Sequence, residues 1–393
     1  MAVERVTRTG WLARVRGAFV GVLVGLLLVA GAGVLQFWNE GRTVRQRILL
    51  ETGQREVVSI DAAEAARHEG RLVHLSDRVH ASGKVEDPEF NQIAEGLGLR
   101  RRVEMYQWRE RKETREETSV GGSKTRRTTY HYEQVWDDDL IDSGRFAEPE
   151  GHRNPERMPF SSRRWLAREV WLGTVRLDPQ VMDEIDGWKP MAVQAERLPP
   201  NLAATFGIED GVLTTVSGEP RIGDLRIRYE RLPEGPLSVV GRLADGVLGP
   251  DPREQGTLLL VERGAHDAAS MFAAAHRRNA GIGWALRGAG FVAMWIGFAM
   301  VLAPLAVLAD VVPIFGRMTR WVSALIGGVL AAVVSLVAIG SGWLYHRPWM
   351  LGVLLLALAA GLFWALVLRP RSRAAGRSAG PPPPPPPSPG APR

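Results

Sequence analysis

The stretch GAFVGVLVGLLLVAGAGVLQFWN, residues 17–39, decides how this chain is built, because it contains no charged residue. A helix rises about 1.5 Å per residue and a bilayer core is about 30 Å thick, so this stretch is long enough to cross a membrane. Four arginines precede it: Arg5, Arg8, Arg14 and Arg16.

A cleaved secretory signal peptide is the competing interpretation, because it has the same order of a basic segment and an apolar run, and residues 30–32 (AGA) offer a cleavage site. The apolar run continues to Trp38, however, which is long for a signal peptide. Trp38 also stands where an interfacial anchor is expected. The pattern therefore favours a retained span over residues 17–38.

Three more stretches without charge lie near the C-terminus, at residues 288–309, 321–345 and 348–368. Only His346 and Arg347 separate the last two, which predicts a tight helical hairpin. None of the four spans carries a charge at its centre, which disfavours a transporter or pump. We therefore predict an α+β, polytopic α-helical membrane protein with four transmembrane helices around one large domain, residues 39–287.

The distribution of charge predicts the orientation of the chain. Residues 40–287 carry 37 Lys and Arg against 41 Asp and Glu, whereas the rest of the chain carries 12 Arg against 2 acidic residues. The basic excess therefore belongs to the membrane flanks and not to a nucleic-acid-binding face. The positive-inside rule places residues 1–16 and 369–393 in the cytosol and residues 39–287 outside it, in a multi-pass protein of the inner or plasma membrane that contacts lipid.

The middle region has strand periodicity between helical ends. Residues 103–110 and 128–136 favour a long β-hairpin, and residues 225–230 alternate between apolar and charged side chains. Residues 71–75, 237–243 and 257–261 are further strand candidates, and Asp178 with Pro179 predicts a helix start. A mixed α/β domain with mainly antiparallel strands follows.

Signatures of catalysis are missing from the sequence. The chain has no cysteine, and it contains no HExxH pair, nucleophile elbow, P-loop or dinucleotide fingerprint. Asp137, Asp138 and Asp139 lack the spacing of a calcium loop, so we interpret them as solvated. We expect no metal, no cofactor and no enzymatic activity. The alternative function is an envelope sensor or enzyme that binds a small ligand in the domain outside the cytosol. Its site would need four side chains to converge, such as His74, Glu104, His131 and Asp224.

Gly17, Gly21 and Gly25 recur at four-residue spacing, so they share one face of the first span. A face of small residues permits close helix–helix contact, either with the chain's own helices or with a second copy. The tail, residues 369–393, includes an unbroken proline run at residues 381–387 and predicts polyproline II. Such a tail serves as a spacer or docks on an aromatic groove.

Several motifs in order resemble one known family over almost the whole chain, the transmembrane protein 43 family, also called LUMA. They are FWNEGR (37–42), EGRLVH (69–74), RVEMYQW (102–108), GHRNP (151–155) and GDLR (223–226). The arrangement of one span, a large domain and three spans is similar too. The resemblance implies a retained first span and a scaffold that self-associates and organises other membrane proteins.

The composition, rich in Ala, Arg and Gly, looks bacterial, so nuclear-envelope partners are not implied, and the proline tail departs from the family's short ending. The first motif contains Trp38, Asn39, Glu40, Gly41 and Arg42, which we interpret as a structural joint. Trp38 would lie at headgroup depth, and Gly41 would end the helix in a left-handed conformation. Glu40 and Arg42 would clamp the first strand of the domain to the membrane surface.

Overall fold

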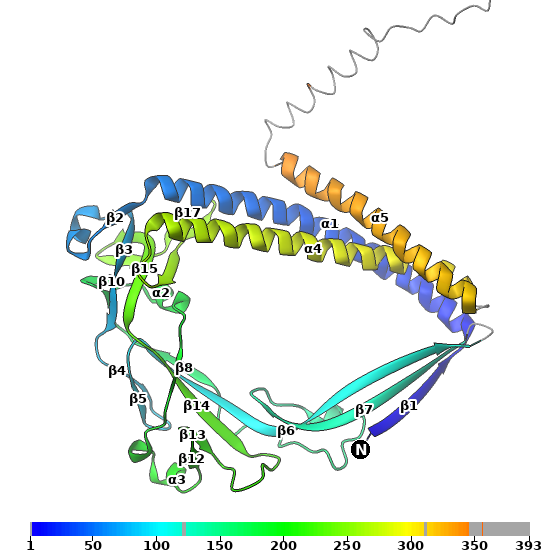
Figure 1. Cartoon of the computed structure of the whole chain (residues 1–393), viewed down its shortest axis with the longest axis horizontal. Coiled ribbons are helices and arrows are strands. Elements are labelled where there is room, and N and C mark those ends of the chain that lie inside the picture. The colour runs from blue at the N-terminus through cyan, green and yellow to red at the C-terminus, as the bar shows by residue number, and fades with distance from the viewer. Residues whose placement is uncertain (1, 120–122, 310–312, 346–355, 357–393) are drawn as a thin grey trace, which may run out of the picture. The chain divides into compact units, whose positions relative to one another are not determined.

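The computed structural model describes residues 2–119, 123–309, 313–345 and Leu356 (Figure 1). Apart from Leu356, the predicted fourth span at 348–368 and the proline-rich tail at 369–393 lie outside the described residues. Three described helices are long and apolar enough to cross a membrane, within Trp11–Glu56, Ala268–Leu308 and Trp321–Tyr345. The structure is therefore α+β with three candidate membrane helices, where the sequence predicted four.

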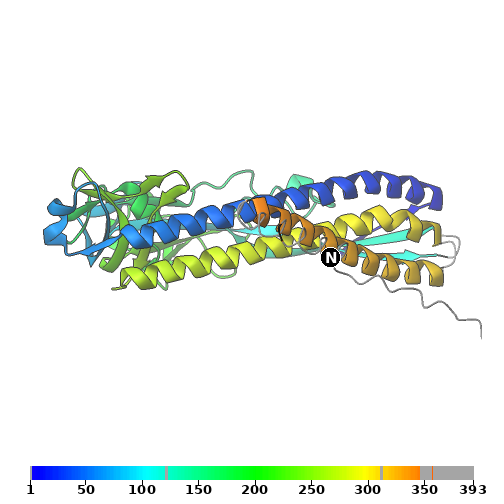
Figure 2. The same ribbon diagram turned by 90° about the horizontal axis from the view of Figure 1, so that it is seen from above.

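The longest helices are α1 (Trp11–Glu56) and α4 (Ala268–Ala309), which pack antiparallel and side by side (Figures 1 and 2). The Trp11 indole near the start of α1 donates a hydrogen bond of 3.0 Å to the Val307 carbonyl near the end of α4. A third helix, α5 (Pro313–Tyr345), joins them through a buried cluster of Ala32, Met294 and Ala331. Ala32 and Ala331 are small, which lets the helix backbones approach closely at this cluster.

Both α1 and α4 continue beyond the predicted spans. Leu49 and Leu50 of α1 are buried with Met271 and Phe272 of α4 and with Leu258. This burial stabilises α1 beyond Gly41, where the sequence predicted that the helix would end. Gly41 instead lies buried inside α1, and the helix ends at Glu56.

An eight-stranded sheet contains the predicted hairpin, with the strand order β1-β7-β6-β14-β13-β12 and with β8 and β11 at its side. Its strands are β1 (Ala2–Thr9), β6 (Gly98–Thr118), β7 (Lys124–Asp137), β8 (Arg163–Leu166), β11 (Lys189–Met191), β12 (Gly207–Glu209), β13 (Val212–Thr214) and β14 (Leu225–Leu232). All pairings in it are antiparallel. Its core contains Phe90, Leu99, Val103 and Ile227.

A seven-stranded sheet has the order β19-β15-β16-β10-β9-β3-β2 and its own core around Val79, Leu172 and Val239. Its strands are β2 (Val58–Ile60), β3 (Leu72–Ala81), β9 (Val170–Leu172), β10 (Val175–Leu177), β15 (Gly235–Ala244), β16 (Val247–Gly249) and β19 (Leu260–Arg263). The smaller elements are β4 (Lys84–Asp87) with β5 (Gln92–Glu95), β17 (Asp251–Arg253) with β18 (Gly256–Leu258), α2 (Pro179–Glu184) and α3 (Pro200–Ala203). Three 3-10 helices complete the domain: η1 (Ala62–His68), η2 (Ser143–Arg145) and η3 (Ala195–Arg197).

Most local predictions for the domain are confirmed. The hairpin is formed by β6 and β7, and the alternating stretch 225–230 lies in β14. Asp178 caps α2, because its carboxylate accepts a hydrogen bond of 2.8 Å from the Gln180 amide. The single strand expected at 257–261 is instead divided between β18 and β19, which belong to different sheets.

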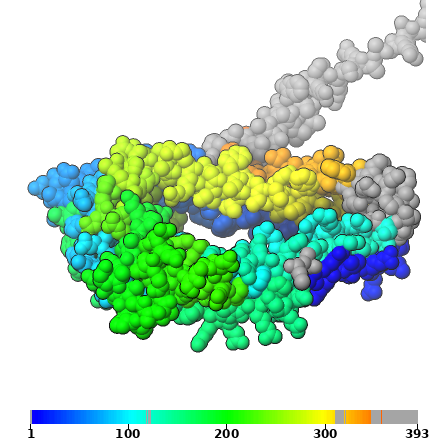
Figure 3. Space-filling view, turned by 60° about the horizontal axis from the view of Figure 1, so that its bottom comes forward, coloured from blue at the N-terminus to red at the C-terminus, as the bar shows by residue number. Residues whose placement is uncertain are grey.

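The strand β1 has no counterpart among the predictions. It pairs with β7 over eight residues, from Ala2 opposite His131 to Thr9 opposite Lys124. In Figure 3 the dark blue N-terminal segment lies directly beside the cyan segment. Residues 2–9, which the charge pattern assigns to the cytosol, thus share a sheet with the domain that the same pattern assigns to the other side.

Candidate functional site at the buried seam of the long helices

A row of buried and half-buried polar side chains lies where α1, α4 and α5 meet, and we call it the polar seam. Its members are Gln36, Asn39, Glu40 and Thr43 of α1, Asn279 and Arg287 of α4, and Ser335 of α5. The four α1 positions fall at i, i+3, i+4 and i+7 and therefore face the same side of the helix. The seam includes two residues of the predicted joint, Asn39 and Glu40.

The centre of the seam is an ion pair between Glu40 and Arg287. The Arg287 guanidinium donates to both carboxylate oxygens, with Nε to Oε1 at 2.7 Å and a terminal nitrogen to Oε2 at 2.8 Å. The Glu40 side chain is 2% exposed and that of Arg287 is 20% exposed. Two parallel hydrogen bonds fix direction as well as distance, so this pair sets the register between α1 and α4.

Amide side chains extend the seam on either side of the ion pair. Asn39 donates to the Gly283 carbonyl at 3.1 Å, and Asn279 donates to the Thr43 carbonyl at 3.1 Å. Gln36 donates to the Ser335 hydroxyl at 3.0 Å and thereby ties α5 to α1. Each helix of the bundle is thus held to α1 by at least one buried hydrogen bond.

Two glycines give the polar side chains room. A Cβ added at Gly290 would lie 2.6 Å from Cγ of Gln36, and one added at Gly342 would lie 3.0 Å from Cβ of Glu40. Among the described residues, Oε1 of Gln36 and Oδ1 of Asn39 are buried without a hydrogen-bond donor.

The predicted joint differs in two respects from what the sequence suggested. Glu40 does not clamp the first strand of the domain; it pairs with α4 instead. Arg42 donates to the neighbouring Thr43 hydroxyl at 3.4 Å, and Trp38 is 52% exposed. The sequence did hold a signal for the ion pair, because Glu40 directly follows the first charge-free stretch and Arg287 directly precedes the second.

The three predicted packing glycines have different surroundings. A Cβ at Gly25 would lie 2.6 Å from the Gly297 carbonyl oxygen, so this position is a close contact between α1 and α4. Gly17 and Gly21 have no described atom within 4 Å of an added Cβ. The described part of the chain therefore uses one glycine of the face and leaves two open.

The four side chains of the predicted small-ligand site lie apart in the described structure. His74 lies in the seven-stranded sheet and contacts the Ser59 hydroxyl and the His266 carbonyl. Glu104 of β6 pairs with Arg226 and Arg228 of β14. Asp224 lies just before β14, where its carbonyl accepts from the Tyr106 amide and its carboxylate accepts from the Thr215 hydroxyl at 2.9 Å; His131 of β7 lies opposite Arg111. The described contacts thus place His74 in one sheet and the other three residues in or beside the other sheet.

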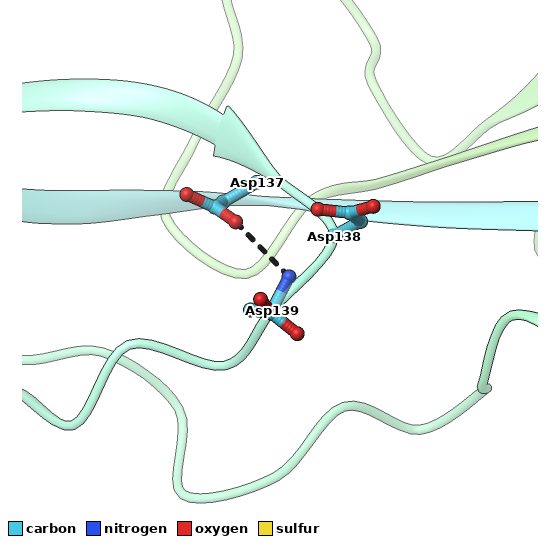
Figure 4. Close-up of side chains that lie close together, drawn as sticks. All are labelled: Asp137, Asp138 and Asp139. Atoms are coloured by element: carbon cyan, nitrogen blue, oxygen red, sulfur yellow. Dashed lines mark hydrogen bonds between the residues drawn. The ribbon is translucent and has the colours of Figure 1, made fainter. Parts of the chain in front are cut away.

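Asp137, Asp138 and Asp139 bring three carboxylates within 4.8 Å of one another (Figure 4). Asp137 already pairs with Arg109 and accepts a hydrogen bond of 3.0 Å from the Asp139 amide. Asp138 and Asp139 are exposed. Asp138 and Asp139 are therefore solvated as expected, Asp137 is paired with a cation, and the absence of a metal here stays a prediction.

Burial affects one titratable group of the domain in particular. Removal from water lowers the pKa of His74, and its hydrogen bond to the His266 carbonyl and the nearby Asp267 carboxylate offset part of that shift. The neutral imidazole bridges two segments, β3 and the loop before α4. This places His74 where the domain meets the long helices.

Together these elements define a multi-pass membrane protein with a sheet-rich domain inserted between its first two membrane helices. The family model described as Transmembrane protein 43 matches residues 105–348. The chain is 31% identical to Transmembrane protein 43 of Homo sapiens over 388 residues, covering 94% of each chain. It therefore belongs to the transmembrane protein 43 family.

Other relatives agree with this assignment. The chain is 31% identical to Transmembrane protein 43 of Rattus norvegicus over 352 residues, covering 86% of this chain and 88% of that one. It is 28% identical to the Transmembrane protein 43 homolog of Drosophila melanogaster over 351 residues, covering 87% and 93%. None of these three relatives carries the name of an enzyme. No solved structure matches the chain.

Proposed function

We propose that this protein is a membrane-anchored scaffold that self-associates through the open glycine face of α1 and organises other proteins of the envelope. The single observation that carries the proposal is the open space beside Gly17 and Gly21 among the described residues. Large apolar side chains flank these glycines and are exposed, including Val20 at 63% and Leu23 at 65%. A helix face of this kind packs well against an equal face of a second copy.

The connection between bundle and domain supports a scaffold role. The polar seam fixes the register of α1 and α4, and the cluster of Leu50, Met271 and Phe272 fixes their ends to the domain. The two helices enter the domain as one packed pair without a flexible linker. Such a joint holds the domain at a set orientation to the membrane helices, as a scaffold requires.

The proposal includes the orientation that the charges predict, with both termini in the cytosol and residues 39–287 outside it. A reporter that is active only outside the cytosol, fused near Ser123, should be active. The same reporter fused after Arg373 should be silent. The opposite pair of outcomes would overturn the orientation.

The association itself is tested with Gly21→Leu, which places a large side chain on the open face, where an added Cβ meets no described atom within 4 Å. We expect insertion and thermal stability of the monomer to persist, while cross-linking between copies falls about ten-fold, which corresponds to a loss of about 1.4 kcal/mol, because the larger side chain keeps the two helices from close contact. Leu27→Ile is the control, since Leu27 is exposed and the volume is conserved. Equal cross-linking of Gly21→Leu and the parent would contradict self-association through this face.

A further inference from the structure

The outer edge of β7 carries a contact that a membrane would remove. Residues 124–131 of this edge are covered by β1, which ends at Thr9, and α1 begins at Trp11. Only a few residues therefore separate β1 from the start of the predicted span at 17–38. The strand β1 therefore lies next to the N-terminal end of the first membrane helix.

Contacts among the described helices show that this end lies opposite the end at which the helices join the domain. Trp11 contacts Val307, and Trp295 donates a hydrogen bond of 2.7 Å to the Ala324 carbonyl, so the charge-free stretches of α1, α4 and α5 lie in register. Their domain-side ends meet at the Glu40–Arg287 pair. At about 1.5 Å per residue, the helix from Trp11 to Glu40 places β1 about 45 Å from that pair, beyond the hydrocarbon core of about 30 Å that residues 17–38 cross in an inserted bundle.

The hairpin cannot follow β1 through a membrane. Between Arg109 and Glu117, eight of nine residues are charged, and such side chains are costly in hydrocarbon. Pairing of β1 with β7 and insertion of α1 across a bilayer therefore exclude each other. In the inserted protein the outer edge of β7 loses β1, and an open strand edge is a template for pairing with another strand.

We propose that, in the membrane, β7 pairs antiparallel with β7 of a second copy around a two-fold axis at Tyr130. The proposal rests on the orientation and the self-association proposed above, and it names a second contact surface for them. A two-fold interface uses the same patch on both copies, so the open edge of β7 in one copy can pair with the same edge of β7 in the other.

The charges of β7 favour this register. With Tyr130 opposite Tyr130, Arg127 of each copy stands opposite Glu133 of the other, which gives two ion pairs by symmetry. In the described structure Arg127 pairs with Glu4 of β1 at 2.9 Å, so removal of β1 leaves this guanidinium available. Glu133 lies 3.3 Å from Arg111 and is half-exposed, so it can accept a second cation. Threonine and tyrosine along the edge favour the strand conformation.

Cysteine cross-linking distinguishes pairing of β7 with β1 of the same chain from pairing of β7 with β7 of a second copy. The chain has no cysteine of its own, so only the introduced thiols react. Tyr130→Cys places two thiols opposite each other only at the two-fold axis, within the reach of a disulfide. Val3→Cys with Tyr130→Cys reports the intramolecular pair, since Val3 lies opposite Tyr130. Both variants are oxidised in native membranes of cells that express the full chain.

We expect the single variant to give a covalent dimer, and the double variant to give the same dimer instead of an internal disulfide. Dominance of the internal Val3–Tyr130 disulfide, or absence of a dimer from Tyr130→Cys, would overturn the proposal. Separation by mass without reducing agent distinguishes the products.

A charge exchange tests the register. In the Tyr130→Cys background, Arg127→Glu places like charges opposite each other twice and should lower the dimer yield about ten-fold. Adding Glu133→Arg should restore it, whereas adding Glu4→Arg should not. Restoration by Glu4→Arg instead, or no effect of Arg127→Glu, would overturn the β7 pairing. If Gly21→Leu abolishes association while Arg127→Glu does not, self-association through the helix stands and the strand contact is contradicted. If Arg127→Glu abolishes association while Gly21→Leu does not, only the helix contact is contradicted.

Discussion

The polar seam and the charged ribbon of β6 and β7 both contain arginine–carboxylate pairs, but the pair in the seam is far more buried than the pair in the ribbon. Arg287 contacts Glu40 at 2.7 Å, and Arg115 contacts Glu113 at 3.0 Å. The seam pair is 20% and 2% exposed, whereas the ribbon pair is 78% and 54% exposed. The distances are similar, so burial is the variable that separates the two regions.

Burial changes what an ion pair contributes. A pair in water gains little, because the solvent screens the charges and long side chains lose freedom. A buried pair gains little in net stability either, but loss of one partner leaves a charge without compensation. The seam pair therefore specifies one register of α1 against α4, while the ribbon pairs keep a long two-stranded element soluble.

The largest effect is expected when the seam pair is broken on one side. Arg287→Met should lower the stability of the detergent-solubilised protein by about 3 kcal/mol, because the Glu40 carboxylate remains buried without a cation. Thermal unfolding in mild detergent measures it. Arg287→Met combined with Glu40→Leu should recover most of the loss, since no charge is then left unpaired. A double variant no more stable than the single one would contradict the role of the pair.

A matched pair of tyrosines extends the comparison to neutral donors. Tyr229 is 2% exposed and donates to Asp87 at 2.6 Å, beside the buried Arg101, whereas Tyr132 of the ribbon donates to Glu110 at 2.8 Å and is less buried. Tyr229→Phe should cost about 2 kcal/mol, because Asp87 loses a donor that water cannot replace. Tyr132→Phe should cost about 0.5 kcal/mol. Equal costs in denaturant unfolding would show that burial does not decide the difference.

The sequence predicted the elements whose signal is local. Absence of charge over residues 17–39 identified the first span, alternation over 225–230 identified β14, and Asp178 before Pro179 identified the cap of α2. Each of these signals lies within the element itself, so no knowledge of a distant partner was needed.

The features that were missed depend on distant partners. Glu40 and Arg287 are 247 residues apart, and the continuation of α1 to Glu56 rests on burial of Leu50 against α4. The strand β1 exists only through its pairing with β7. Helix propensity and strand alternation cannot report such contacts, because they describe one segment at a time.

The next test concerns the pH range in which His74 contributes to stability. Burial lowers its pKa in the folded state, so between that pKa and the ordinary value of about 6.5 the unfolded chain binds more protons. Stability should therefore be constant above about pH 6.5 and should fall as the pH drops below it. His74→Gln should remove this part of the pH dependence in denaturant titrations at pH 5 to 7.5. An unchanged pH dependence would show that His74 is not its source.

The smallest effect is expected from the exposed pair of the ribbon, which is the control for the seam. Arg115→Gln should change stability by less than about 0.5 kcal/mol, because the Glu113 carboxylate stays hydrated after the guanidinium is removed. Raising the salt concentration should change the parent and the variant equally. Denaturant unfolding of both proteins, at low and high salt, measures this. A cost near that of Arg287→Met would mean that this part of the ribbon is covered in the assembled protein, and the contrast drawn between seam and ribbon would then fail.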